Sequence, residues 1–372
     1  MNWFSALRSN GQQTTSARQQ YEDEQYQEEI VAQFYLSFPK LECVCNDYCD
    51  DDKLSAGVAS VQGWRVNQED AHICDLNFDP VNRLALFAIF DGHNGPEIAC
   101  YAAKHLPQLI KNNSHYWKKD YGIFPVIYLY VHLILIHFYF LGKALEEAFL
   151  QFDSSLLDND VNNELKNISH QYELCYGRIK RRQTSPLLAM VTGSTAVVAL
   201  LCKQNGQLHV SNIGDSRCAI YNKNKSHPMT LDHKPTDAKE LKRIEMSGSR
   251  VINGRINSGL NLSRAFGDYM LKSNGSLGPK EQAVIAWPDL TVSNEKFRRN
   301  DFIVLACDGI WNSMNEKEAC SVIKKCIKKK MKPSKICQEV IQRCISPVRP
   351  IDGQNGGDNM TCIVVKFEQD LP

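Results

Sequence analysis

Short apolar runs of strand length recur along the chain, and each ends at a turn residue. The runs are rich in Val, Ile, Leu and Phe, and Gly, Asp or Asn stands at or close behind the end of most of them. Runs of this kind are typical of buried β-strands. We predict strands at residues 84–90, 195–201, 208–213, 302–307 and 361–367.

Between these runs, longer segments carry apolar residues at helical spacing. The clearest is 316–330, where Ala319, Val322, Ile323, Cys326 and Ile327 follow the i, i+3, i+4, i+7, i+8 pattern of one helix face. Further helices are predicted at 96–112, 143–157 and 236–247. Because strands outnumber helices and come in hairpin-like pairs, the pattern favours an α+β fold with sheet packed on sheet over a doubly wound parallel sheet.

Two polar segments and one apolar segment depart from this pattern. Residues 1–53 are rich in Gln, Ser, Asn and acidic residues, which predicts a poorly ordered N-terminal extension. Residues 158–190 are polar and turn-rich, which predicts a loop or a partly helical insert. Its RIKRRQTSP stretch is either a solvated loop tip, a regulated phosphosite or a nuclear-localisation-like patch. Residues 123–142 contain no Asp, Glu, Lys or Arg and are long enough to be a transmembrane candidate.

Composition excludes several classes of protein. With 43% hydrophobic and 23% charged residues, the chain is neither wholly disordered nor collagen-like. The 43 Lys and Arg against 42 Asp and Glu leave a net charge of +1, so we expect no nucleic-acid partner from overall charge.

Cysteine usage and the N-terminus bear on the compartment. The 14 cysteines are irregularly spaced, which is typical of small buried thiols in a reducing compartment. Cys43, Cys45 and Cys49 form C-x-C-x3-C without a second cluster at zinc spacing, which argues against a zinc site. The N-terminus lacks the pattern of a signal peptide. We expect a cytoplasmic or nuclear protein, or one found in both.

Acidic residues stand at the ends of predicted strands or in the loops near them. They are Glu69 and Asp70 in GWRVNQEDAH, Asp91 in FDGHNG, Asp308 in ACDGIW and Asp358 in GGDNMT. Carboxylates that converge at one sheet edge repel one another and lose solvation unless cations lie between them. Carboxylate oxygens and a backbone carbonyl such as that of Gly92 suit Mg²⁺ or Mn²⁺, and two such ions together favour phosphate-ester hydrolysis.

Two further residues suit the same chemistry. Arg65 offers a planar fork of donors for phosphate oxygens. His93 lies two positions after Asp91, where it can protonate a poor alkoxide leaving group. Without the neighbouring acidic residues, a lone His after a turn or a lone Arg would be more typical of a solvated surface.

Eight sequence blocks in order resemble the metal-dependent protein serine/threonine phosphatases of type 2C. The eight blocks are GWRVNQEDAH, LFAIFDGHNG, GSTAVVALL, VSNIGDSRCAI, LDHKPTD, GLNLSRAFGDY, FIVLACDGIWNSM and GGDNMTCIVV, and they span about residues 55–367. Within them, the wording of GRINSGLNLSRAFGD and DGIWN is most similar to the gamma-type members.

The resemblance implies a four-layer α/β/β/α sandwich with two central, mainly antiparallel sheets over residues 54–368. It implies that Asp91 bridges two metal ions, that the Gly92 carbonyl joins one of them, and that Asp308 and Asp358 hold the other. Glu69 and Asp70 would bind metal-coordinated waters, Arg65 the substrate phosphate, and His93 would be the general acid. Asp215 with Asp308 matches a weaker third metal site, where Asn312 replaces the aspartate of many members.

The resulting prediction is a phosphatase that hydrolyses phosphoserine and phosphothreonine in proteins through a water that bridges two Mg²⁺ or Mn²⁺ ions. A non-catalytic phosphoprotein-binding scaffold of the same fold is the alternative. We expect phosphoprotein substrates and a monomer.

Three interpretations of residues 123–142 stay open. A single membrane span would put Asp91 and Asp308 on opposite sides of the bilayer, so we expect no membrane association. The run is otherwise an extra packed element, or an insertion such as an in-frame retained intron, because removing about twenty residues would restore the length usual in the family.

Overall fold

The computed structural model describes residues 35–50, 53–117, 129–179, 181–351 and 354–371, and describes no side chain at 117 or from 129 to 140. The strands are β1 (Tyr35–Lys40), β2 (Val44–Cys49), β3 (Leu54–Val61), β4 (Gly63–Arg65), β5 (Asp70–Asp79), β6 (Leu84–His93), β7 (Gly193–Ser194), β8 (Ala196–Cys202), β9 (Leu208–Ile213), β10 (Arg217–Asn222), β11 (Lys225–Pro228), β12 (Val251–Ile252), β13 (Arg255–Ile256), β14 (Phe266–Gly267), β15 (Asp289–Ser293), β16 (Phe302–Ala306) and β17 (Met360–Phe367). The helices are α2 (Glu97–Asn112), α3 (Ser114–Trp117), α4 (Leu129–Ser155), α5 (Asn159–Tyr176), α6 (Ala238–Met246), α7 (Asp308–Trp311), α8 (Glu316–Lys328) and α9 (Pro333–Cys344).

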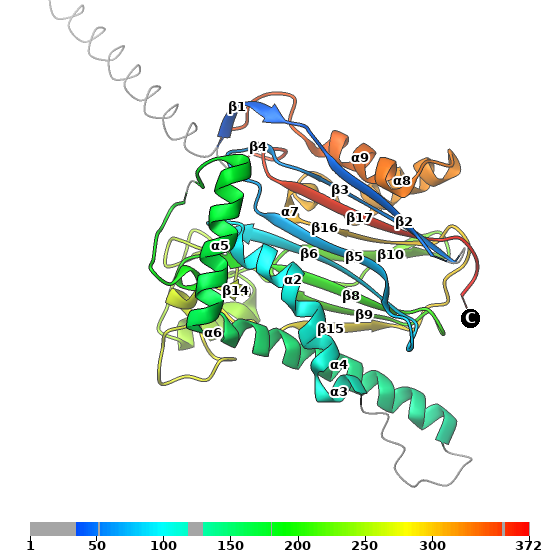
Figure 1. The fold of residues 1–372 in the computed structure, drawn as a ribbon, viewed down its shortest axis with the longest axis horizontal. Coiled ribbons are helices and arrows are strands. Elements are labelled where there is room, and N and C mark those ends of the chain that lie inside the picture. The colour runs from blue at the N-terminus through cyan, green and yellow to red at the C-terminus, as the bar shows by residue number, and fades with distance from the viewer. Residues whose placement is uncertain (1–34, 51–52, 118–128, 180, 352–353, 372) are drawn as a thin grey trace, which may run out of the picture.

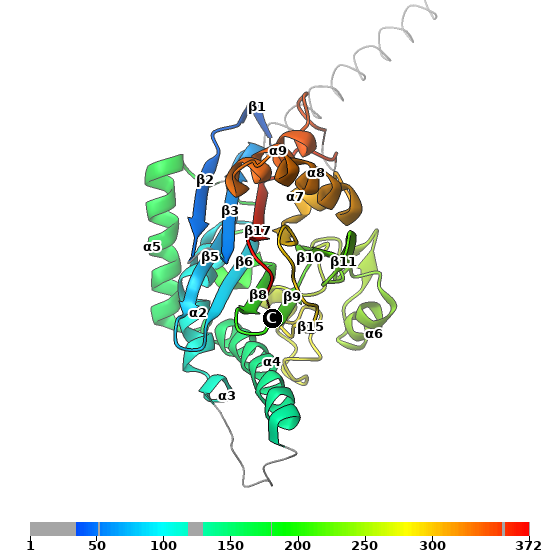
Figure 2. The ribbon, with the colours of Figure 1, turned by 90° about the vertical axis from the view of Figure 1, so that its right-hand side faces the viewer.

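Two antiparallel sheets form the centre of the fold (Figure 1). Within the described residues, one sheet has the order β11-β10-β16-β17-β3-β2, and the other has β14-β7-β6-β8-β9-β15 with β5 also paired to β6. Helices α8 and α9 cover the first sheet, while α2 and α4 cover the second (Figures 1 and 2). The expected four-layer α/β/β/α sandwich is confirmed.

Strand β6 shows how the sequence produces these layers. Side chains of a strand alternate between its two faces. Leu86, Ala88 and Phe90 therefore face the helices, while Phe87 and Ile89 face the other sheet. Both faces are buried, which explains why this strand reads as a continuous apolar run.

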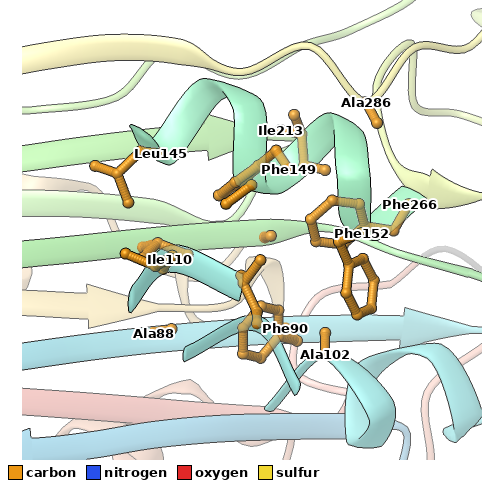
Figure 3. Packing of buried hydrophobic residues seen from close by; sticks show 14 of the residues in the cluster. Ala88, Phe90, Ala102, Ile110, Leu145, Phe149, Phe152, Ile213, Phe266 and Ala286 are labelled. Carbon is orange, nitrogen blue, oxygen red and sulfur yellow. The ribbon is translucent and has the colours of Figure 1, made fainter. Parts of the chain in front are cut away.

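The helical layer over β6 packs through aromatic side chains. Phe149 and Phe152 of α4 lie against Phe266, with ring centroids 5.1 and 4.6 Å apart (Figure 3). Ala102 and Ile110 of α2 complete the same cluster. This packing fixes α2 directly behind the end of β6, where His93 lies.

The N-terminal segment differs from the expected extension over residues 35–49. Strand β2 pairs with β3 along its whole length, from Val44 opposite Ser60 to Cys49 opposite Ser55, and β1 pairs with β4. Strand β2 lies at the sheet edge, so it carries few apolar residues and its sequence reads as polar. Residues 1–34 lie outside the described residues.

Of the two alternatives predicted for residues 158–190, the structure has the partly helical insert, because residues 159–176 form helix α5. Only Asn162 and Leu165 of this helix are buried, so it lacks the wide apolar stripe that sequence reasoning relies on. The other predicted helices are confirmed to within a few residues at their ends, except that α4 begins well before residue 143.

The apolar run is helical in its second half. Residues 118–128 lie outside the described residues, but Leu129 begins α4, which continues without a break through Gly142 to Ser155. Two views show the N-terminal half of α4 extending away from the sheets (Figures 1 and 2). Within the described residues, no helix meets the length and hydrophobicity that a membrane crossing requires.

Candidate metal centre

Asp70 and Asp91 face each other across neighbouring strands. They are Cα partners in the β5–β6 ladder, and one ligand atom of each, with the thiol of Cys307, lies within 4.8 Å of the others. Thr361 donates a hydrogen bond to Asp70 Oδ2 at 2.6 Å. Asp70 Oδ1 is buried and accepts no hydrogen bond from any described residue. A buried carboxylate oxygen without a donor is the feature that a bound cation would satisfy.

Further carboxylates converge on this pair. Burial raises the pKa of Asp91 well above its ordinary value, and the charges of Asp70, Asp308, Asp358 and Asp215 raise it further. The sequence-predicted acidic residues therefore lie close enough to act on one another electrostatically. Without a cation, such a cluster must hold protons that it would otherwise release.

The neighbouring carboxyl groups show the same perturbation. Burial raises the pKa of Asp70 to about 7. Burial also raises the pKa of Asp308 well above its usual range, with Asp215 and Asp358 as the next causes. Asp308 opens α7, and Asn312 donates to its Oδ2 at 3.0 Å.

Gly92 brings the turn after Asp91 against the 66–69 loop. Its N–H donates to the Glu69 carbonyl at 3.2 Å, and a Cβ at position 92 would lie only 2.4 Å from that oxygen. Glycine is therefore required for this approach. The Glu69 carboxylate accepts from Asn67 at 3.1 Å, and burial raises its pKa to about 7.

Arg65 and Asp358 form an ion pair at the rim. Arg65 Nη2 lies 2.6 Å from Asp358 Oδ2, and each side chain is about one-third exposed. The guanidinium also stands 5.5 Å from the ring centroid of Tyr35. Arg65 Nε is buried and lacks an acceptor in the described part of the chain. The guanidinium thus keeps donor capacity beside the acidic cluster.

His93 is held by a residue that sequence reasoning missed. Its Nε2 lies 2.7 Å from Asp268 Oδ2, although the two residues are 175 positions apart. Burial alone would lower the pKa of His93, but the negative charge of Asp268 and its hydrogen bond outweigh burial and raise it. A Cβ at Gly193 would lie 2.3 Å from Asp268 Oδ2 and 2.4 Å from His93 Nε2. The pair depends on glycine at that position.

Asp215 forms an ion pair with a lysine side chain. Lys234 forms an ion pair with its Oδ2, and Asp215 is almost fully buried. The lysine is held in place because the neighbouring His233 accepts from the Gly214 N–H at 3.1 Å and donates its own N–H to the Gly214 carbonyl at 3.0 Å. Lys234 stands in LDHKPTD, one of the blocks that carry the family resemblance, but no role was predicted for it.

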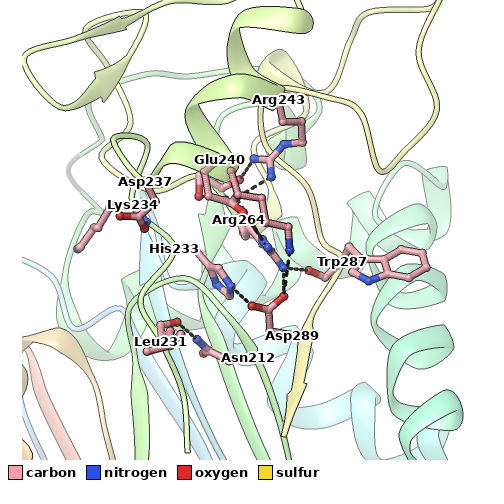
Figure 4. Close-up of polar contacts among 12 residues, drawn as sticks. Asn212, Leu231, His233, Lys234, Asp237, Glu240, Arg243, Arg264, Trp287 and Asp289 are labelled. Atoms are coloured by element: carbon pink, nitrogen blue, oxygen red, sulfur yellow. Dashed lines mark hydrogen bonds and ion pairs between the residues drawn. The ribbon is translucent and has the colours of Figure 1, made fainter. Parts of the chain in front are cut away.

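A buried charge network anchors the segment that carries Lys234 (Figure 4). Arg264 is almost fully buried and pairs with Glu240 at 2.7 Å and with Asp289 at 2.7 Å. Arg243 pairs with Glu240 at 2.6 Å, and His233 lies 3.2 Å from Asp289. These contacts fix the segment from 231 to 289 next to the acidic cluster.

Comparison with known proteins now decides the family. The family model for protein phosphatase 2C matches residues 54–349. A relative from Oryza sativa subsp. japonica, "Probable protein phosphatase 2C 11", is 34% identical over 358 residues and covers 91% of each chain. The chain belongs to the protein phosphatase 2C family.

Other members agree with this assignment. "Protein phosphatase 2C homolog 2" of Schizosaccharomyces pombe is 32% identical over 85% of this chain and 74% of that protein. The solved "serine-threonine phosphatase 2C from Toxoplasma gondii" shares the fold, with a TM-score of 0.61 at 20% identity over 90% of this chain and 98% of that chain. This 2C family member is a protein serine/threonine phosphatase, and the family depends on metal.

Proposed function

We propose that the chain hydrolyses phosphoserine and phosphothreonine in proteins with two Mg²⁺ or Mn²⁺ ions held by Asp91, the Gly92 carbonyl, Asp308 and Asp358. The observation that carries this proposal is the buried carboxylate cluster around Asp91, whose pKa is raised by burial and by the charges of its neighbours. Glu69 and Asp70 flank the cluster and would bind waters on the ions.

The donor set suits hard cations. Its members are carboxylate and carbonyl oxygens, which Mg²⁺ and Mn²⁺ prefer. The one sulfur in the group is Cys307, and burial raises the pKa of its thiol well above the usual range. A protonated thiol is neither a metal ligand nor a nucleophile, which supports magnesium or manganese over zinc and disfavours a cysteinyl-phosphate intermediate. When bound, such ions lower the pKa of a shared water and offset the charge of the carboxylates.

The chain's own residues then bind the substrate and move the proton. Arg65 Nε has no acceptor among the described residues, and its Nη2 pairs with the one-third-exposed carboxylate of Asp358, so the guanidinium can bind the substrate phosphate. His93, whose pKa is raised by the charge and hydrogen bond of Asp268 against the effect of burial, can give its proton to the departing serine or threonine oxygen. Asp268 orients the imidazole and does not itself contact the substrate.

The third metal position, at Asp215 and Asp308, would bind an ion more weakly than the other two. Asp215 already pairs with the Lys234 ammonium, and Asn312 supplies a neutral amide where a carboxylate would bind more strongly. A third ion at Asp215 and Asp308 would therefore have to compete with the Lys234 ammonium for Asp215.

The cysteines bear on the compartment in which the protein acts. All fourteen cysteines are free thiols, as is usual in a reducing compartment, so we place the protein in the cytoplasm or the nucleus. We propose that it acts as a monomer on phosphoprotein substrates.

A phosphothreonine peptide assay tests the proposal. We expect Mn²⁺-dependent phosphate release that a chelator abolishes and that Asp308→Asn lowers by at least about a hundredfold. Asp160→Asn, an exposed aspartate of α5, is the matched control and keeps wild-type activity. Activity that is indifferent to Mn²⁺, to the chelator and to Asp308→Asn would refute the proposal.

A further inference from the structure

Two cysteines at the start of β2 touch each other. Cys45 Sγ lies 2.8 Å from Cys43 Sγ, and both residues are partly exposed. A disulfide needs a separation of about 2.05 Å, so only a small movement would bond these sulfurs. Cys43 precedes Val44, the first residue of β2, and therefore lies outside the strand ladder.

The residues around Cys43 and Cys45 favour a dithiol over a metal site. Gln338 of α9 donates to Cys45 Sγ at 2.8 Å and holds that thiol in position. Cys49, the third cysteine of the motif, is exposed at the far end of β2. The described residues offer no third metal ligand close to Cys43 and Cys45. Two thiols in contact with no third ligand favour thiol oxidation over zinc binding.

The dithiol is linked to the substrate end of the site through one short connection. Residues 41–43 join β1 to β2, and β1 pairs with β4 at Lys40 opposite Gly63 and at Tyr35 opposite Arg65. The Tyr35 ring also lies under the Arg65 guanidinium. The backbone at Cys43 is thus joined through residues 41–42 and β1 to the strand that contains Arg65.

We propose that Cys43 and Cys45 form a reversible disulfide when the protein meets a peroxide or a disulfide oxidant such as oxidised glutathione. With peroxide, the Cys43 thiolate attacks one oxygen, the O–O bond breaks, hydroxide leaves and takes up a proton, and a sulfenic acid forms. The Cys45 sulfur then attacks Cys43 Sγ, an S–S bond forms, and water leaves with the Cys45 proton. Burial and the adjacent Cys43 raise the pKa of Cys45 to about 12, so Cys45 reacts second.

The disulfide shifts β1 and with it Arg65, which weakens substrate binding. This second step rests on the proposed function of Arg65, whereas disulfide formation does not. We expect the KM for a phosphothreonine peptide to rise by about threefold on oxidation with little change in kcat, because Arg65 binds the phosphate before and during the reaction.

The experiment oxidises the full chain with hydrogen peroxide and, separately, with oxidised glutathione, and then maps the cysteines by alkylation and peptide mass spectrometry. We expect Cys43 and Cys45 to be protected together in one peptide that loses two hydrogens, and dithiothreitol to restore both thiols. Cys45→Ser should abolish the bond, and Cys49→Ser, a cysteine in the same strand, should leave it intact.

Each outcome decides one step. If Cys43 and Cys45 are alkylated independently after oxidation, or each carries a separate glutathione, the disulfide proposal fails. If the disulfide forms but the KM stays within error of the reduced protein, the link to Arg65 fails. A protein with no phosphatase activity in the reduced state would instead refute the proposed function and leave the disulfide result standing.

Discussion

Replacing Asp268 with Asn tests how the imidazole of His93 is kept ready to donate a proton. The substitution keeps the size of the side chain and a hydrogen-bonding group 2.7 Å from His93 Nε2, but it removes the negative charge. Asp268 has a left-handed backbone with a φ of 53°, a conformation that Asn adopts readily, so the fold should not change. The variant therefore isolates the charge.

The expected size of the effect follows from the loss of charge at the hydrogen bond between Asp268 and His93. A hydrogen bond to a charged group contributes about 1.5–3 kcal/mol, and one between neutral groups about 0.5–1.5 kcal/mol. The difference of about 1 kcal/mol corresponds to a kcat about fivefold lower on a phosphothreonine peptide at neutral pH. The pKa of His93 should also fall, because Asp268 is the largest cause that raises it against burial.

The assay compares two leaving groups. A serine or threonine alkoxide needs a proton to depart, whereas 4-nitrophenolate does not, so hydrolysis of 4-nitrophenyl phosphate should fall by less than about twofold. If Asp268 acts only through His93, adding Asp268→Asn to His93→Gln should lower peptide hydrolysis no further than His93→Gln does alone. An equal loss on both substrates, or a full additional loss in the double variant, would show that Asp268 acts on the site in some way other than through His93.

Three further perturbations have defined outcomes. Gly193→Ala places a Cβ against both His93 and Asp268, so peptide hydrolysis should fall at least about tenfold while circular dichroism stays native; wild-type kinetics would contradict the geometry. The pKa of Glu240 is lowered to about 2, since its bonds to Arg264 and Arg243 outweigh burial. Because its pKa is lowered in the folded state, ionised Glu240 stabilises the fold above about pH 4.5, and this contribution is lost as the pH falls toward 2. The free energy of unfolding measured in urea should therefore fall by about 3 kcal/mol over that window in the wild type, and this loss should be absent in Glu240→Gln. Finally, Mn²⁺ should raise the melting temperature of the wild type by several degrees and that of Asp308→Asn by much less, which differential scanning fluorimetry can check; equal shifts would place the ion elsewhere.

The sequence predicts the central strands well because they are buried on both faces. Strands such as β6 and β17 are continuous apolar runs of strand length that end at turn residues, and this pattern is typical of strands buried on both faces. The same rule fails at the periphery. Strand β2 is stabilised by its ladder with β3, and α5 by a few contacts on one side, so neither needs an apolar pattern that a sequence can show.

The acidic cluster could be predicted because its residues share one chemical type and recur at strand ends. The partners that position it could not. The pairing of His93 with Asp268 and of Asp70 with Thr361 depends on how distant segments pack, and neither partner carries a local signal beyond its place in a motif. Lys234 was likewise visible only as part of LDHKPTD, because its ion pair with Asp215 is set by the fold of the 231–237 segment.

The most direct test of the two-metal centre is a calorimetric titration of Mn²⁺ into chelator-treated protein. If Asp91 bridges both ions, the wild type should bind two Mn²⁺ tightly, and Asp91→Asn should lose tight binding of both together with peptide hydrolysis. Two tight sites that survive in Asp91→Asn, or a wild type that binds Mn²⁺ at neither site, would contradict the account.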